Sequence, residues 1–269
     1  MNYDVQHEMI EGIERITYIP QNQQFDTPIV FQHGAWHGAW CWQYWQEVFA
    51  ELGWVSHAHS LPSHGKSDDK RNIRLCTLGY YQDALREQVE LCDTKPIVVG
   101  HSMGGAITQW YIKQWDDLSA GILLASMPLR DNVLRYIIAD PLGMAMSTLI
   151  GHGKPLVRSP EQVKKLFISD DAIMSAEDLH AQLGAESILP PLQLNPFTWQ
   201  PKRNPTTPML VMAAERDTIF TVKEQVALKE HYEADYYLMK NTAHNAMMES
   251  NYHDHAIYLH NWLMAQGIT

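Results

Sequence analysis

Residues 96–105, PIVVGHSMGG, decide the fold of this chain. The first half is short, apolar and β-branched, which predicts a buried strand. The second half has the spacing G-x-S-x-G, and a helix is predicted to begin at Ala106. A serine on such a strand-to-helix turn has a strained backbone and a hydroxyl exposed above the sheet, and the flanking glycines permit the turn. We therefore predict that Ser102 is a nucleophile; the alternative is a glycine-rich turn with an incidental serine.

Two further candidate side chains follow apolar runs later in the chain. Residues 208–214 (PMLVMAA) form a predicted strand with Asp217 on the turn after it, and residues 236–239 (YYLM) lead to His244. A serine hydroxyl is a weak nucleophile that needs a base, and the base needs an orienting acid. Open parallel sheets build their sites past the ends of their strands. We therefore predict a catalytic triad of Ser102, Asp217 and His244.

Each member of this triad also has an ordinary interpretation. Asp217 could be a surface turn residue with Glu215 as a competing acid, and His244 is one of fourteen histidines. A helix is predicted to begin after Thr221, because Thr221 and Glu224 have the spacing of a capping box. This helix places Asp217 on a short strand-to-helix connection. Serine, aspartate and histidine at three strand ends, in this order along the chain, favour the catalytic interpretation.

An upstream loop supplies the candidate oxyanion hole. Residues 29–31 (IVF) form a predicted strand, and residues 32–42 (QHGAWHGAWCW) follow it. An oxyanion hole takes one N–H from the residue after the nucleophile and one from the loop after an early strand. We predict that Met103 and Ala35 provide these two donors.

The aromatic side chains of that loop divide into two groups. We expect Trp40 and Trp42 to pack in the core under the first helix. Trp36 and His37 are candidates for walls of a substrate pocket, and Met127 is a third candidate. Methionine adapts to irregular ligands, which suits such a wall.

These motifs together resemble the α/β-hydrolase superfamily over nearly the whole chain. The matching segments are residues 33–35 (HGA), 61–67 (LPSHGKS), 100–105 (GHSMGG), 215–217 (ERD) and His244. The GHSMGG form is similar to monoacylglycerol lipases, lysophospholipase-like proteins and small bacterial carboxylesterases. The loop HGAWHGAW is similar to that of plant methylesterases and hydroxynitrile lyases.

One segment departs from the superfamily pattern. The superfamily usually reads D-x-P-G-H-G-x-S, and this chain has Ser60 and Ser63 in place of the aspartate and the first glycine. Because that loop is structural in most members, we expect the chemistry to be intact and the edge of the cavity to be reshaped.

The resemblance implies an α/β fold with a mostly parallel, twisted sheet and helices on both faces. Residues 10–128 fit alternating strands and helices, whereas residues 129–205 fit helices and turns, with helix starts after Ser159 and Ser175. The resemblance makes residues 129–205 a helical cap inserted in one domain spanning residues 1–269. The first part of the cap and the residue before it are apolar; most of these side chains are expected to pack on the core, and together they leave room for an apolar channel. They are Met127, Leu134, Ile137, Ile138, Met144, Met146, Leu149 and Ile150.

The resemblance also implies a serine hydrolase that cleaves a carboxylic ester through an acyl-enzyme without a cofactor. Serine at residue 102 argues against dehalogenases and epoxide hydrolases of this fold, which have aspartate there. Two alternatives stay open. One is a hydroxynitrile lyase or carbon–carbon bond hydrolase with the same triad, since such lyases usually add a lysine near the histidine and Lys240 precedes His244 by four residues. The other is a ligand receptor with slow turnover.

Composition limits the partners of the chain. The net charge of −11 argues against nucleic acid and anionic membrane surfaces, which select basic patches. The sequence has no apolar run long enough to span a membrane, and its first residues lack the features of a signal peptide. Cys41, Cys76 and Cys92 lack the spacing of a disulfide framework, which favours the cytoplasm. We expect a small-molecule ester as partner, and a homo-oligomer stays open.

Histidines near one another raise the question of a metal site. His57 and His59 share one face of a predicted strand and His64 follows closely, but no carboxylate lies between them. Because histidine pairs alone rarely complete a coordination shell, we expect no metal here.

Overall fold

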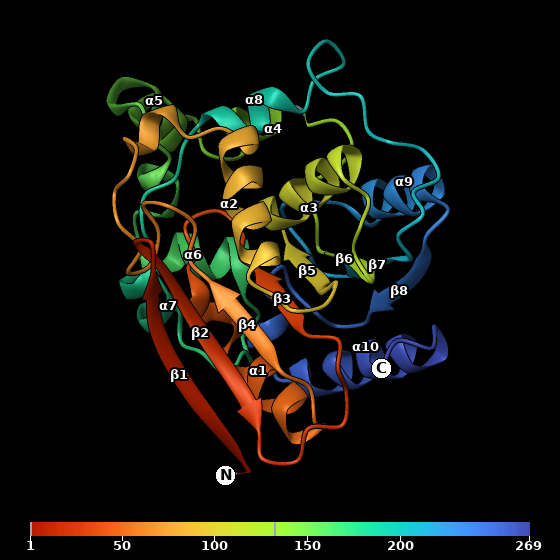
Figure 1. Cartoon of the computed structure of the whole chain (residues 1–269). Helices are drawn as coiled ribbons and strands as arrows, with labels where there is room; N and C mark the ends of the chain where they lie inside the picture. Colours follow the sequence, from red (N-terminus) through yellow and green to blue (C-terminus); the bar gives the residue numbers. More distant parts are fainter. Residues whose placement is uncertain (1, 132) are drawn as a thin grey trace.

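The computed structural model describes residues 2–131 and 133–269. Within them, eight strands form one sheet in the order β1-β2-β4-β3-β5-β6-β7-β8 (Figure 1). The pairs from β4 through β8 are parallel, whereas β1–β2 and β2–β4 are antiparallel. The strands are β1 (Tyr3–Ile10), β2 (Ile13–Pro20), β3 (Ile29–Gln32), β4 (Ser56–His59), β5 (Ile97–His101), β6 (Ala120–Leu124), β7 (Met209–Ala214) and β8 (Asp235–Met239).

Helices cover both faces of the sheet (Figure 1). Successive side chains of a strand point to opposite faces, so Ile97 and Val99 of β5 pack in one core and Val98 in the other. The first core includes α1 (Gln43–Glu51) and α10 (Tyr252–Ala265). Helices therefore pack on both faces of a mostly parallel sheet, which confirms the predicted fold class. The second core includes three helices. These helices are α2 (Leu78–Glu90), α3 (Met103–Gln114) and α9 (Val222–Tyr232).

The N-terminal hairpin of β1 and β2 was not predicted from the sequence. β1 lies at the edge of the sheet and most of its side chains are exposed, although Tyr3, Val5 and Met9 alternate with polar residues along it. β2 is almost entirely buried and connects the hairpin to β4. The alternation of strands and helices expected over residues 10–128 therefore begins only at β3.

Between β6 and β7 the described chain contains helices and no strand. We call residues 129–205 the helical insertion. Its longer elements are α4 (Leu134–Ala139), α5 (Pro141–Ile150), α6 (Pro160–Phe167), α7 (Ala176–Gln182) and α8 (Leu189–Gln193). Short 3-10 turns lie at Lys154–Val157 within it and at Ala39–Trp42, Ile73–Leu75 and Ala246–Met248 elsewhere. Ser159 and Ser175 cap α6 and α7, as their sequence patterns predict.

The apolar side chains of α4 and α5 correct one expectation. Met127 is buried and Met144 lies on a cavity wall, but most of the others are exposed instead of packed on the core. Both helices are apolar on more than one face, and only one face of a helix can turn toward the interior. The exposed side chains are Leu134, Ile137, Ile138, Met146 and Leu149. Among the described residues, no helix combines the length and apolarity needed to cross a membrane.

Candidate active site

Ser102 lies on a tight turn between β5 and α3. Its φ of 55° and ψ of −117° place a non-glycine residue in a rarely populated region of backbone space. Ser102 is itself the N-cap of α3, so the helix begins at Met103, earlier than the predicted Ala106. A Cβ at Gly104 would lie 2.3 Å from the carbonyl oxygen of Gln32, so glycine lets α3 approach β3 closely. The serine is thus held at the carboxyl end of a central strand.

Asp217 and His244 form a buried hydrogen-bonded pair. Nδ1 of His244 lies 2.7 Å from Oδ2 of Asp217, and both side chains are almost fully buried. The other carboxylate oxygen accepts hydrogen bonds from the backbone amides of Ile219 and Phe220 at 2.8 and 3.0 Å. These two bonds orient the carboxylate, and its contact with Nδ1 places the imidazole proton on that nitrogen. Nε2 of His244 is buried and has no hydrogen-bond partner among the described residues.

The competing acid lies elsewhere. Glu215 is exposed and forms an ion pair with Lys240, with 2.7 Å between Oε1 and Nζ. Its second oxygen accepts a hydrogen bond from the backbone amide of Asn241. The structure therefore separates the two acids that the sequence left in competition: Asp217 contacts His244, and Glu215 contacts Lys240 at the surface.

The turn that carries Ser102 and the loop that carries His244 are in contact. Nε2 of His101 lies 3.0 Å from the backbone carbonyl oxygen of His244, and the centroids of the two rings are 4.8 Å apart. The rings of Phe167 and Phe220 lie 5.9 and 5.6 Å from the His244 ring. The imidazole of His244 therefore sits buried among aromatic rings, next to the residue that precedes Ser102.

The loop after β3 passes directly over the serine. A Cβ at Gly34 would lie 2.8 Å from Cβ of Ser102, so only glycine permits this approach. Ala35 and Met103 both line the same cavity as Ser102. Neither backbone amide donates a hydrogen bond within residues 2–131 and 133–269. Two unpaired N–H groups beside a serine are what an oxyanion hole requires.

His37 does not line the cavity, contrary to the expectation from the sequence. It is buried, and its Nδ1 donates to the carbonyl oxygen of Ala35 at 2.7 Å. Its Nε2 accepts from Nδ2 of Asn245 at 3.0 Å. Burial lowers its pKa to about 4, so the ring is neutral, as this pattern of one donor and one acceptor requires. His37 thus supports the Ala35 loop from behind, with Trp40 stacked on it at 5.4 Å.

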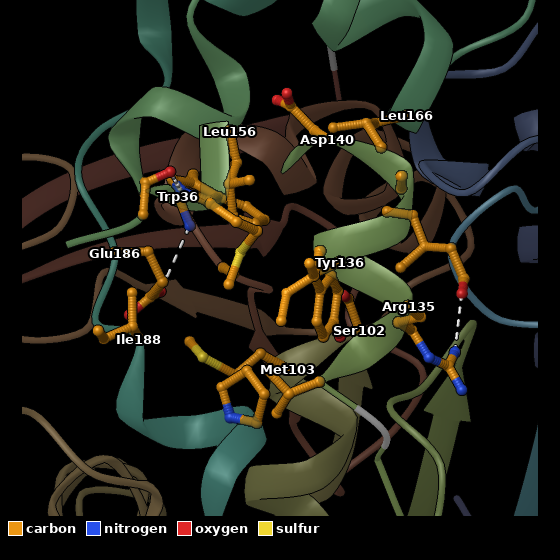
Figure 2. A pocket seen from close by; sticks show the side chains of 18 of the residues that line it. Trp36, Ser102, Met103, Arg135, Tyr136, Asp140, Leu156, Leu166, Glu186 and Ile188 are labelled. Atoms are coloured by element: carbon orange, nitrogen blue, oxygen red, sulfur yellow. Dashed lines mark hydrogen bonds between the residues drawn. The ribbon is translucent and has the colours of Figure 1, made fainter. Parts of the chain in front are cut away.

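The cavity above Ser102 has a volume of about 430 Å³ (Figure 2). The helical insertion forms most of its wall, and Trp36 and Met127 lie on it, where the sequence placed them. Trp42, by contrast, is fully buried in the core, as expected. Most of the wall is apolar, and its larger side chains include Met144, Leu156, Leu166, Ile188 and Leu192.

Charged groups on the cavity wall were missed by the sequence motifs. Arg135 reaches the wall, but its guanidinium is paired with Glu224 and Asp131. Lys165 is exposed at the cavity, and Glu186 is buried there. No short motif contains these residues, because they are far from Ser102 along the chain and approach it only in the folded structure.

The loop at residues 60–67, which departs from the superfamily pattern, was expected to reshape the edge of the cavity. Its two unusual serines instead have structural roles. Ser60 donates to Oε2 of Glu14 at 2.6 Å and accepts from the amide of Ala39 at 2.8 Å, so it anchors the segment after the oxyanion loop. Ser63 has a φ of 66°, the left-handed conformation that glycine would adopt more easily. Neither serine lies on the main cavity wall.

The histidines considered for a metal have other partners. Nδ1 of His57 lies 2.9 Å from Oγ1 of Thr17, and Nε2 of His59 lies 3.0 Å from Oε1 of Gln32. Among the described residues, no three histidine, cysteine or acidic side chains are close enough to hold a metal ion.

Known proteins share both sequence and fold with this chain. It is 29% identical to Methylesterase 10 of Arabidopsis thaliana over 174 residues, which cover 61% of this chain and 60% of that protein. It is 26% identical to the pFDCC methylesterase MES16 of the same plant over 234 residues, 81% of this chain and 87% of the relative. The crystal structure of that Arabidopsis methylesterase superposes with a TM-score of 0.67 at 20% identity, covering 88% of this chain and 99% of the other, which shows a shared fold.

The model of the alpha/beta hydrolase family matches residues 29–256, which run from β3 into α10. This range contains the Ser102 turn, the loop after β3 that carries Ala35, and the Asp217–His244 pair. The chain therefore belongs to the alpha/beta hydrolase family.

Proposed function

We propose that this chain hydrolyses carboxylic esters of small, largely apolar substrates through an acyl-enzyme on Ser102. The observation that carries this proposal is the His244 imidazole. Its Nδ1 is bonded to the Asp217 carboxylate, and its Nε2 has no partner among the described residues. An imidazole whose Nδ1 is held by a carboxylate and whose Nε2 is unpaired is placed to act as the base that accepts a serine proton.

The reaction follows from these groups. Oγ of Ser102 attacks the acyl carbon while Nε2 of His244 takes the hydroxyl proton. The carbonyl electron pair moves to the oxygen, and the amides of Ala35 and Met103 stabilise that oxyanion. Collapse of the intermediate expels the alcohol, which receives the proton from His244. Water then attacks the acyl-enzyme while Nε2 of His244 takes its proton. Collapse of this second intermediate breaks the bond to Oγ of Ser102 and releases the acid, and His244 gives the proton back to Oγ.

The apolar cavity supports a neutral acyl group. Burying a charged acyl group requires a cationic partner. Of the two cations on the wall, Arg135 is paired with Glu224 and Asp131, whereas Lys165 is exposed to solvent. Lys154 and Arg158 do not line the cavity. We further propose that the helical insertion acts as a cap over this site. The names of the two Arabidopsis relatives, both methylesterases, support an ester as substrate.

The position of Lys240 weighs against a lyase. Hydroxynitrile lyases of this fold use a lysine close to the catalytic histidine, whereas Lys240 is mostly exposed and paired with Glu215.

We also propose that the protein is located in the cytoplasm. Cys41, Cys76 and Cys92 are all free thiols, which a reducing compartment such as the cytoplasm preserves.

Labelling of the nucleophile tests the proposal. A fluorophosphonate probe should modify Ser102, and p-nitrophenyl esters should be turned over. Ser102→Ala should abolish labelling and lower turnover about a millionfold. Ser119→Ala, at a partly exposed serine that donates to the Lys95 carbonyl, is the matched control and should change neither. Labelling without turnover would indicate a slow receptor, and labelling of another serine would overturn the assignment.

A further inference from the structure

Trp36, directly after the candidate oxyanion donor Ala35, has an unfavourable backbone conformation. Its φ of 65° lies in the left-handed region, which a bulky non-glycine residue seldom occupies. Such a conformation costs about 1–3 kcal/mol and persists only where the surroundings impose it. The position of the Ala35 amide therefore depends on whatever holds Trp36.

The groups that hold Trp36 all belong to the helical insertion (Figure 2). The backbone amide of Trp36 donates to Oε2 of Glu186 at 3.4 Å, and its carbonyl oxygen accepts from the amide of Gly184 at 2.8 Å. Its indole nitrogen donates to the carbonyl oxygen of Gly153 at 3.1 Å. Glu186 provides the only side chain among these partners.

Glu186 is itself fixed from several sides. Its side chain is 3% exposed, and Nε2 of His64 lies 2.9 Å from Oε2. Oε1 accepts from the hydroxyl of Tyr81 at 2.9 Å and from the amide of Ser187 at 2.7 Å. With the Trp36 amide, the two carboxylate oxygens accept four hydrogen bonds. A carboxylate has about four acceptor sites, so none is left for a substrate.

His64 provides the counter-charge. Its Nδ1 lies 3.0 Å from the carbonyl oxygen of Pro62, and its Nε2 faces the Glu186 carboxylate. Both acceptors lack a proton to give, so both ring nitrogens are donors and the imidazole is positively charged. Burial opposes this charge, but the charge and hydrogen bond of Glu186, together with the Pro62 carbonyl and Asp69, outweigh burial and raise the pKa of His64.

We propose that Glu186, locked by His64 and Tyr81, is a positioning residue that holds Trp36 and thereby aims the Ala35 amide at the developing oxyanion. The inference rests on the proposed function, because it assigns a role in the same reaction. It also makes the helical insertion part of the catalytic machinery, since the core loop at Trp36 is correctly placed only while residues 184–186 are docked on it.

The variant Glu186→Gln tests this role. A glutamine has nearly the same size but only one acceptor oxygen, so the four donors cannot all be satisfied. We expect kcat to fall about 10- to 100-fold while KM changes less than about threefold, because the oxyanion exists only after binding. Affinity for a trifluoromethyl ketone, which forms an oxyanion on Ser102, should fall by the same factor as kcat/KM.

Asp116→Asn is the matched control. Asp116 anchors the C-terminal end of the insertion through Lys202 at 2.8 Å, and the chain just after it through the amides of Thr206 and Thr207. It lies just beyond the C-terminal end of α3, far from Ser102. The Asp116→Asn variant should have a lower melting temperature than the wild type and an unchanged kcat. Should Glu186→Gln not fold, Tyr81→Phe removes one donor to the same carboxylate, and we expect kcat to fall about threefold.

The outcomes separate the two proposals. Wild-type kcat and labelling of Ser102 in wild type and in both variants test ester hydrolysis, whereas the ratio of variant to wild-type kcat tests Glu186. Wild-type kcat retained in Glu186→Gln, or in Tyr81→Phe when that is the folded variant, overturns the positioning role and leaves the esterase proposal standing. A wild-type protein that neither reacts with the probe nor cleaves esters overturns both.

Discussion

Nε2 of His101 lies 3.0 Å from the backbone carbonyl oxygen of His244, so the residue before the candidate nucleophile contacts the residue proposed as its base. A carbonyl oxygen only accepts, which places a proton on Nε2 of His101. Burial and the neighbouring His244 lower the pKa of His101, so its ring stays neutral. This hydrogen bond fixes the distance between the β5 turn and the loop after β8.

Loss of that bond should misplace the base. We expect His101→Leu to lower kcat about 10- to 100-fold, because small misplacements of reacting groups are costly. His101→Gln retains a donor and should recover most of the activity. The measurement is kcat for p-nitrophenyl butyrate, with circular dichroism as a check on folding. Equal activity of the two variants would contradict a role for the hydrogen bond.

Substitutions of Asp217 and of Glu215 should have very different effects on turnover. Asp217→Asn should keep the fold but lower turnover about ten-thousandfold at neutral pH, since an amide stabilises the wrong tautomer of His244. Glu215→Gln breaks only a surface ion pair with Lys240 and should change turnover little. Steady-state kinetics of both variants decide the matter, and the reverse order of effects would show that the acid is Glu215.

Acid should destabilise the protein through its buried neutral histidines. Burial lowers the pKa of His37 to about 4, and burial together with Arg15 lowers that of His59 to about 3. Unfolding restores a value near 6.5, so between about pH 6.5 and 3 the unfolded chain binds more protons and stability rises with pH. The contribution is complete above pH 6.5 and is lost as the pH falls. His64 acts in the opposite sense, because its pKa is raised.

Melting temperatures from pH 4 to 7 test this dependence. Each such histidine adds at most about 1.4 kcal/mol per pH unit to the slope of the unfolding free energy. In His59→Gln the glutamine side chain can still contact Gln32, but it does not titrate. The melting temperature of this variant should therefore fall less steeply as the pH is lowered than that of the wild type. Parallel slopes for the two proteins would rule out His59 as a contributor.

The chain length of the acyl group should set specificity. For straight-chain p-nitrophenyl esters we expect affinity to rise by about 0.8 kcal/mol per buried methylene until the cavity is full. An ester with a carboxylate on its acyl group, and an anilide, should both be poorer substrates. A flat response, or preference for the charged ester, would contradict an apolar acyl group and direct attention to Lys165 on the wall.

The sequence alone determined the fold class and the order of the three candidate catalytic residues. Both depend on local patterns: apolar runs form the strands, Ser102 follows β5 directly, and Asp217 and His244 lie three and five residues beyond the ends of β7 and β8. Because parallel strands end at the same edge of a sheet, residues distant in sequence converge without any further information. Their chemical roles stay predictions until the variants above are measured.

Only the tertiary structure decided how the site is supported. Glu186 meets His64 across 122 residues, and Asn245 meets His37 across 208, so neither contact follows from local patterns. His37 was expected on the pocket wall because of its place in the loop after β3, yet it lies behind that loop. Most apolar side chains of α4 and α5 were expected to pack on the core, yet they are exposed. A side chain's partners depend on which elements pack together, and the free energy of that packing is a property of the whole chain rather than of any segment.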